Sequence, residues 1–331
     1  VFLLAYLYHS VFALEFFGGK LHEVKGSIQQ TLNYRTHQDE RSVKFSSFRT
    51  TFRIEGLYDL ITQPCWDVKL YGLFNYWYDN ATNIDHDLED AIRLESGGSH
   101  GLRAFRRANE QEEILRELYF EIKRGATFKA RLGKQLVSWG ETAESRVADL
   151  INPLDLANML AFPDWEDFKV GLWMGRFFFT PQNMWQDLSF ELIVIPPDFQ
   201  YNRFPPAGSG LYFGTPQGLT VPLIFRTFYW PDAMEWQFNK MRHDAPANTW
   251  SNTEVGMRIR GNTWGADWTL SHFYTRLDSP ILDGMKGATN FQNKLFNEMN
   301  KQLGVPPFKR KVGRVFTYPH YLSSAITFSK P

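Results

Sequence analysis

The sequence predicts an all-β fold, specifically an antiparallel transmembrane β-barrel, from three observations. Segments in which apolar and polar residues alternate recur along the chain, and the connections between them are alternately short and long. Aromatic residues are numerous (29 Phe, 14 Tyr and 11 Trp), although 22% of the residues are charged. A barrel accommodates both features, because its outer band is apolar with aromatic girdles and its lumen is polar.

The lengths of the connections favour a barrel over a soluble sandwich. The short connections are 60–64, 124–126, 180–186 and 261–265, and the long ones are 79–113, 140–167, 196–250 and 278–310. Outer-membrane barrels have tight periplasmic turns and longer extracellular loops, whereas a sandwich has no reason to sort its loops in this way. No apolar run long enough for a membrane helix follows residue 19, which excludes a helical membrane protein.

The two ends of the sequence are interpreted separately. Residues 1–13 (VFLLAYLYHSVFA) are predicted to be the remnant of a secretory signal peptide with a small residue, Ala13, at its cleavage site. A buried N-terminal strand or helix is the alternative. Residues 14–331 are predicted to form the barrel. We expect that barrel to be incomplete, because bacterial barrels commonly close with a strand that ends in an aromatic residue and this sequence continues past Phe328.

Three strands are predicted before residue 80. In each of them alternate residues form an apolar face, and the residues between them form a polar face that can meet water. The apolar faces contain Val24, Gly26, Ile28, Leu32 and Tyr34; Phe48, Thr50, Phe52, Ile54 and Tyr58; and Trp66, Val68, Leu70, Phe74 and Tyr76.

The remaining strands are predicted as hairpins. Segments 117–123 and 128–136 are joined by the tight turn Arg124-Gly125-Ala126, and together they are long enough to span a bilayer twice. The same arrangement is predicted for 167–179 with 187–195 and for 251–260 with 266–275. A less regular run covers 311–328, which brings the prediction to about ten strands.

Two residues fall on otherwise apolar faces. These are Lys134 and His272. A charge in the middle of a bilayer costs roughly 2–4 kcal/mol, and a charge near an interface costs far less. We therefore expect both residues to lie near an end of their strands, unless the register differs there.

Two long connections are predicted to contain structure of their own. Apolar residues recur at helical spacing over 291–303, and Gly304 supplies a stop signal, so an amphipathic helix is expected there. This helix could narrow the lumen or pack outside it. A further short hairpin within 196–250 would raise the number of strands by two.

No enzyme signature is present. The sequence contains no HxxxH or HExxH spacing, no GxSxG motif and no phosphate-binding glycine loop before a helix. Ser271 and His272 are adjacent, so on a strand they point to opposite faces and cannot act together. Cys65 is the only cysteine and the net charge is zero, so neither a thiolate metal site nor a nucleic-acid partner is indicated. We predict no catalytic residues, no metal and no cofactor.

The most specific signal is the sequence GKQLVSWGE at 133–141, followed by NPLD at 152–155. This motif resembles a family of Gram-negative outer-membrane barrels of unknown function that are often encoded beside RND-type exporters. The resemblance covers roughly residues 14–170. It implies a bacterial outer-membrane location with lipid contact, transport or export of hydrophobic molecules, and an inner-membrane exporter with a periplasmic component as partners. It supplies no catalytic residues.

The motif is predicted to anchor a loop. Trp139 would lie at the membrane interface, and Gly140 would let the backbone bend where the strand ends. Glu141 and Asp155 would pair with lumen bases such as Arg131 and fix the loop, which also contains Asn152 and Pro153, against the barrel wall. We favour this structural role over contact with a substrate.

The polar faces define the predicted lumen. The residues assigned to it are Arg49, Arg53, Glu55, Asp67, Lys69, Glu117, Glu121, Lys129, Arg131 and Gln135. Neighbouring opposite charges largely cancel, so we expect a weakly ion-selective outer-membrane channel or export conduit for hydrophobic or amphipathic molecules. The alternatives are a non-transporting barrel that acts as a scaffold or receptor through its extracellular loops, and a secreted polysaccharide-binding β protein.

Overall fold

A computed structural model describes residues 21–34, 45–95, 114–140, 149–155, 165–182, 187–202, 243–279, 281–282 and 316–329. The predicted signal-peptide remnant (1–13), the predicted helix (291–303) and most of the segment that might hold a further hairpin lie outside these residues.

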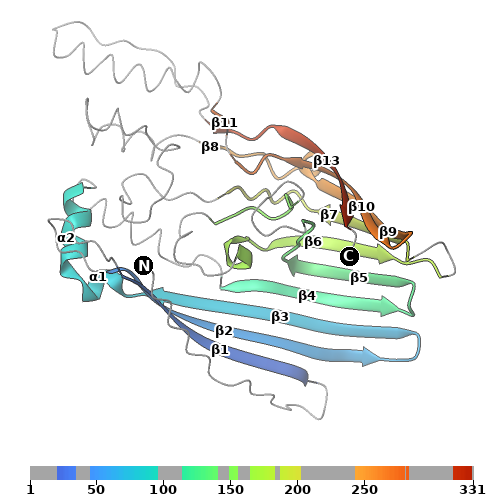
Figure 1. The fold of residues 1–331 in the computed structure, drawn as a ribbon, viewed down its shortest axis with the longest axis horizontal. Coiled ribbons are helices and arrows are strands. Elements are labelled where there is room, and N and C mark those ends of the chain that lie inside the picture. The colour runs from blue at the N-terminus through green and yellow to red at the C-terminus, as the bar shows by residue number, and fades with distance from the viewer. Residues whose placement is uncertain are drawn as a thin grey trace, which may run out of the picture.

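One antiparallel sheet of ten strands dominates the described structure (Figure 1). Each strand of this sheet pairs with the next one of the sheet along the chain. The strands are β1 (Leu21–Tyr34), β2 (Phe45–Thr62), β3 (Trp66–Asp79), β4 (Leu115–Arg124), β5 (Phe128–Gln135), β6 (Leu172–Phe179), β7 (Ser189–Ile195), β9 (Glu254–Thr263), β10 (Ala266–Arg276) and β13 (His320–Ser329). The ten predicted strands are confirmed, with shifted boundaries. The sheet is not closed among the described residues: β1 and β13 are its two edges.

Tight turns lie at one end of the sheet and long connections at the other (Figure 1). At the tight end, Gln63 and Trp66 exchange backbone hydrogen bonds of 2.8 and 3.2 Å between β2 and β3. Between β9 and β10, Trp264 (φ 54°) and Gly265 (φ 74°) both have positive φ, as a two-residue turn that matches the twist of the strands requires.

The connection between β3 and β4 contains two helices that the sequence analysis did not predict. They are α1 (Ala81–Ile84) and α2 (His86–Glu95). The side chain of Asp79 accepts a hydrogen bond from the backbone N–H of Ala81 (3.0 Å), and Asp85 accepts one from that of Leu88 (3.3 Å). Such side-chain acceptors satisfy the free N–H groups at helix starts. None of the described helices is long and apolar enough to cross a membrane.

Shorter elements complete the described structure. Three two-residue strands, β8 (His243–Asp244), β11 (Ile281–Leu282) and β12 (Phe316–Thr317), form a separate small sheet. Two short 3₁₀ helices, η2 (Trp165–Phe168) and η5 (Trp250–Asn252), precede β6 and β9. Both of these helices lie at the end of the large sheet that carries the long connections.

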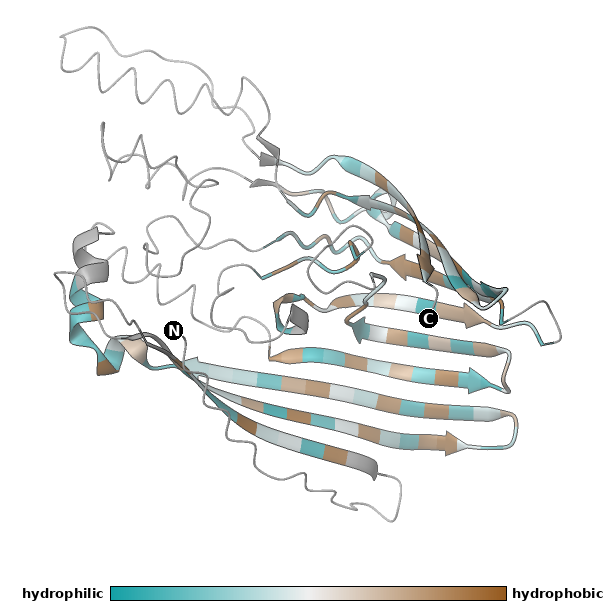
Figure 2. Cartoon of the chain, in the orientation of Figure 1, coloured by the Kyte–Doolittle hydropathy of each residue, from teal (hydrophilic) through white to brown (hydrophobic). Residues whose placement is uncertain are grey.

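The large sheet has one continuous apolar face. Residues that are directly paired across neighbouring strands share a face. One such row crosses nine strands, from β2 to β13, and contains only apolar residues and one glycine: Tyr58, Leu70, Phe120, Leu132, Gly175, Val194, Val255, Tyr274 and Leu322. The alternation along each strand is visible as bands of unlike hydropathy (Figure 2).

Burial is the reverse of that in a water-soluble sheet. On the apolar face, Ile54 is 56% exposed and Ile326 is 65% exposed. On the opposite face, here called the polar face, charged side chains such as Glu191 and Arg258 are buried. A sheet with one face in water normally buries its apolar face and exposes its polar one.

The hydrophobic core lies on the polar face, near the long connections. Residues of β6, β7 and β10 pack there against segments 136–140 and 149–155, which follow β5. The cluster consists of Val137, Trp139, Ile151, Leu172, Met174, Ile193, Ile195 and Phe273.

Of the two residues that interrupt the apolar faces, Lys134 and His272, one lies near a strand end as expected. Lys134 is the second-last residue of β5 and is buried beside Gly171, so it lies at a strand end as expected. The expectation for His272 is wrong, because it lies in the middle of β10 on the apolar face. Its Nδ1 lies 2.8 Å from Ser324 Oγ on β13, and this hydrogen bond reduces the cost of a polar ring there.

Candidate functional site

Charged residues form two rows on the polar face. In the first row, directly paired residues of β2 to β6 are Asp59, Lys69, Glu121, Arg131 and Arg176. In the second row, residues of β3 to β9 are Asp67, Lys123, Lys129, Phe178, Glu191 and Arg258. Both rows follow from the two-residue period of the strands, which places every second side chain on the same face.

Ion pairs link neighbouring strands within the first row and also link the two rows along a strand. Glu121 contacts Arg131 Nε through one carboxylate oxygen (2.7 Å) and Lys123 Nζ through the other (2.7 Å). Lys69 Nζ lies 3.2 Å from Asp59 and 3.8 Å from Asp67. The polar face is therefore held together largely by charge-assisted contacts.

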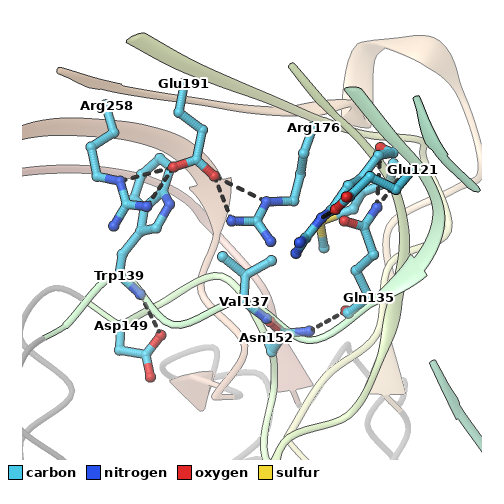
Figure 3. Close-up of polar contacts among 11 residues, drawn as sticks. Glu121, Gln135, Val137, Trp139, Asp149, Asn152, Arg176, Glu191 and Arg258 are labelled. Carbon is cyan, nitrogen blue, oxygen red and sulfur yellow. Dashed lines mark hydrogen bonds and ion pairs between the residues drawn. The ribbon is translucent and has the colours of Figure 1, made fainter. Parts of the chain in front are cut away.

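Glu191 is shared by two arginines that approach it from either side (Figure 3). Arg176 donates to Oε1 from Nε (3.0 Å) and Nη2 (2.7 Å), and Arg258 donates to Oε2 from Nε (2.9 Å) and Nη2. All three side chains are almost inaccessible. Removing these charges from water costs free energy, and the cost is offset only while each charge keeps its ion-pair partner.

The ten residues predicted to line a lumen all lie on the polar face. Their strand register places them on the same side as the two charged rows. Arg49, Glu121 and Gln135 are buried, whereas Arg53 is exposed. The structure thus brings the set together on one surface, and whether that surface encloses a lumen stays a prediction.

Several residues of the polar face were not identified from the sequence. Arg176, Glu191 and Arg258 occupy alternate positions in regular strands, so the same period-two argument could have found them. Asp149 and Lys169 lie outside strands and form a buried ion pair of 2.7 Å. This ion pair joins two connections, so no periodic pattern in the sequence predicts it.

The motif segments 133–140 and 152–155 fold across the polar face. Asn152 organises the crossing: its Oδ1 accepts from Val137 N–H (2.8 Å), and its Nδ2 donates to the carbonyls of Gln135 (3.2 Å) and Val170 (2.8 Å). Gln135 Nε2 donates in turn to Met174 O on β6 (3.2 Å). These bonds replace the strand pairing that ends with β5 (Figure 3).

A buried polar group fixes the same crossing at a second point. Asp149 accepts from Trp139 N–H (3.3 Å) with one carboxylate oxygen and pairs with Lys169 Nζ (2.7 Å) through the other. Lys169 also donates to Ser138 Oγ. Segments 136–140, 149–155 and 165–171 are thereby tied into one layer over the sheet.

The predicted interfacial position of Trp139 is wrong. The residue is 6% exposed and lies on the polar face, where its ring packs edge-on against Phe273 (6.2 Å between centroids) and below Arg258 (5.1 Å). A Cβ on Gly256 would lie 2.8 Å from the indole, so the glycine provides space for it. The chain turns inward after β5, which takes Trp139 away from the apolar face.

The other motif residues are placed as follows. Gly140 lies close to Asp149, whose Cβ would be 3.2 Å from a Cβ added to the glycine, and its predicted role in bending the backbone stays a prediction. Gly133, within β5, has a φ of +141°, and a Cβ added there would lie 2.2 Å from Leu118 O. Glu141 is outside the described residues. The backbone N–H of Asp155 donates to Phe168 O (2.6 Å), and Pro153 is buried. The carboxylate that pairs with Arg131 is that of Glu121.

An aromatic cluster lies beyond the strands, at the end with the long connections. The ring of Tyr318 lies 5.1 Å from that of Phe199 and 5.3 Å from that of Tyr201. Burial and, secondarily, Tyr201 raise the pKa of the Tyr318 phenol, so it is neutral at physiological pH. The described residues contain no group of His, Cys, Asp and Glu side chains that could hold a metal ion.

These features define a class: an antiparallel all-β protein with an exposed apolar face and a polar face lined by ion pairs. The chain belongs to the family described as protein of unknown function (DUF1302), whose profile matches residues 23–319. No curated protein and no solved structure matches the chain.

Proposed function

We propose that this protein is an outer-membrane β-barrel that acts as a passive channel or export conduit for hydrophobic or amphipathic molecules. The observation that carries the proposal is the polarity of the sheet. An apolar row that crosses nine strands, and in which Phe120, Leu132 and Leu322 are exposed, has no favourable place in water, whereas lipid would cover it.

The distribution of aromatic residues on the apolar face supports a bilayer. Trp66, Phe179 and Phe328 are exposed near the short turns, and Tyr76, Trp173 and Tyr274 are exposed near the long connections. Aliphatic residues such as Leu132 lie between the two groups. Phe120, which is directly paired with Leu132, shows that aromatic residues also occur between the two groups. Aromatic residues near both ends of the strands are typical of proteins whose strands cross a membrane.

In this proposal the polar face lines the conduit. Its alternating ion pairs would cancel much of the long-range field, so the channel should discriminate weakly between small cations and anions. The resemblance to barrels encoded beside RND-type exporters adds an inner-membrane exporter and a periplasmic component as partners in this proposal.

A non-transporting scaffold or receptor is the second candidate, and one observation favours it. The layer formed by 136–140 and 149–155 covers part of the polar face, so it would narrow or close a lumen. A plugged barrel predicts a folded membrane protein without conductance.

Gel migration and conductance test both candidates. The protein expressed with a signal peptide is expected in the outer-membrane fraction, and its unboiled and boiled forms should migrate differently on a gel. Planar-bilayer recordings should then show weakly selective conductance. A folded barrel without conductance would favour the scaffold or receptor. Protein that is soluble without detergent would reject both candidates.

A further inference from the structure

The alternation of charge on the polar face breaks at two neighbouring pairs, one in each row. Along the first charged row the signs alternate from Asp59 through Lys69 and Glu121 to Arg131, but Arg131 on β5 is directly paired with Arg176 on β6. In the second row Lys123 on β4 is directly paired with Lys129 on β5. Like charges directly opposite each other destabilise a sheet.

Lys123, Lys129, Arg131 and Arg176 form what is here called the cationic cluster. Neither β5 nor β6 contains an acidic residue. The carboxylates that form ion pairs with these cations are on the flanking strands, and each is shared: Glu121 between Lys123 and Arg131, and Glu191 between Arg176 and Arg258. Asp67, which is directly paired with Lys123, contacts Lys69 instead (3.8 Å). Glu117 is also on this face, where it accepts a hydrogen bond from Leu136 N–H (2.8 Å). Four cations (Lys123, Arg131, Arg176 and Arg258) therefore share two ion-pairing carboxylates, Glu121 and Glu191.

Part of the donor capacity of the cationic cluster is unused. Among the described residues, Lys129 forms no ion pair, and its Nζ lies 4.3 Å from the centre of the Phe178 ring. Arg131 contacts Glu121 through Nε, and no described residue accepts from its two terminal nitrogens. The side chains of Lys123 and Arg131 are 42% and 29% exposed, so a solute can reach them.

The position of the cationic cluster determines from which end of the sheet a solute can reach it. The buried apolar cluster around Val137 and Met174 lies toward the long connections, whereas Lys129 and Phe178 lie next to the short turns. The cationic cluster therefore lies between the inward-folded layer and the end of the sheet with the short turns.

We propose that the cationic cluster is a binding site for an oxyanion, the carboxylate or phosphate group of a solute. An oxyanion between Lys129 and Arg131 would accept from the free guanidinium nitrogens and would separate the two like-charged pairs. The binding site itself does not depend on the proposed function. The further inference that the transported molecule carries such a head group rests on the proposed function.

Unfolding of the folded protein in a neutral detergent tests the site. Sodium phosphate at low millimolar concentration should raise the unfolding temperature more than sodium chloride of equal ionic strength, because a ligand that binds only the native state stabilises it. In Lys129→Gln we expect at least half of this increment to be lost. In chloride alone this variant should unfold at the same temperature as the wild type or higher, since a like-charged pair has been removed.

Arg124→Gln is the matched control. It removes one positive charge from the end of β4, where Arg124 lies over the Trp66 ring (5.2 Å) rather than in the cationic cluster. Any general stabilisation by phosphate remains in this control. An equal increment in the wild type and both variants, or no increment beyond that of chloride, overturns the proposal.

A second series with sodium acetate identifies the head group. A larger increment with acetate assigns a carboxylate, and a larger one with phosphate assigns a phosphate. Conductance is recorded separately on the same preparations. Conductance without an anion-dependent increment would reject the site and leave the channel, whereas the increment without conductance would reject the channel and leave the site.

Discussion

At the scale of single residues, the polar face depends on groups that have several partners each. Glu191 neutralises two buried arginines, Asn152 satisfies three backbone groups, and Asp149 bonds both Trp139 N–H and Lys169. Removing such a residue leaves more than one buried polar group without a partner. The free-energy cost should therefore exceed that of an ordinary hydrogen bond.

Glu191→Gln should be strongly destabilising. It leaves Arg176 and Arg258 buried without their carboxylate, and breaking a buried pair in this way costs about 3–5 kcal/mol. Guanidinium unfolding in lipid vesicles measures the change. Replacing all three residues by apolar residues of similar size should recover much of the loss, and a single variant as stable as the wild type would contradict the shared ion pair.

Trp139→Ala should lower the unfolding temperature in detergent. The indole fills the space between Phe273, Gly256 and Arg258, and its removal leaves a cavity that costs about 3–5 kcal/mol. Trp264→Ala is the control, because Trp264 is 92% exposed in the β9–β10 turn. An unchanged unfolding temperature for Trp139→Ala would be incompatible with the buried position.

At the scale of elements, β5 is where the sheet and the inward-folded layer meet. Gly133 adopts a positive φ there and its backbone closely approaches Leu118 O on β4. The strand ends two residues later, at Gln135. Beyond it, the side chain of Asn152 forms hydrogen bonds with the backbone of Gln135 and Val137. A glycine is required because any side chain would collide with the neighbouring strand.

Gly133→Ala should therefore disrupt the pairing of β4 with β5. Gly125→Ala is the matched control: its φ is +58°, but no atom lies within 4 Å of the added Cβ, so only backbone strain of roughly 1–2 kcal/mol applies. Heat-dependent gel migration compares the folded fractions of the two variants. Equal folded fractions would show that the close approach at Gly133 is not needed.

At the scale of the whole molecule, the reversal of exposure distinguishes this sheet from one that works in water. The apolar row continues from β2 to β13 without a charged residue, and the charges gather on the other face. Because the apolar face is this extensive, a water-soluble monomer would carry a large uncovered hydrophobic surface. This argues for lipid as its surroundings in the proposed function.

Leu132→Arg tests that environment. Leu132 lies in the middle of the apolar row, and an arginine at the midplane of a bilayer costs about 2–4 kcal/mol. Insertion into lipid vesicles should fall, while Trp264→Arg in the β9–β10 turn should insert normally. Equal insertion of both variants would mean that Leu132 does not face lipid.

The strands and their faces could be predicted from the sequence. Alternation along β3, for example, correctly separated Phe74 and Tyr76 from Lys69 and Asn75, because the direction of a side chain in a strand depends only on position. The ten predicted lumen residues share one face for the same reason. The sequence alone thus determined the number of strands in the large sheet and the polarity of its two faces.

The tertiary structure decided what the connections do. The inward path of 136–140, the burial of Trp139 and the Asp149–Lys169 pair depend on contacts between segments that follow no local period. The helices α1 and α2 also went unpredicted: α1 is only four residues long, and the helical spacing of Leu88, Ala91 and Ile92 in α2 was overlooked within a long connection. Local geometry fixes a strand, whereas a connection is fixed by the surface on which it comes to lie.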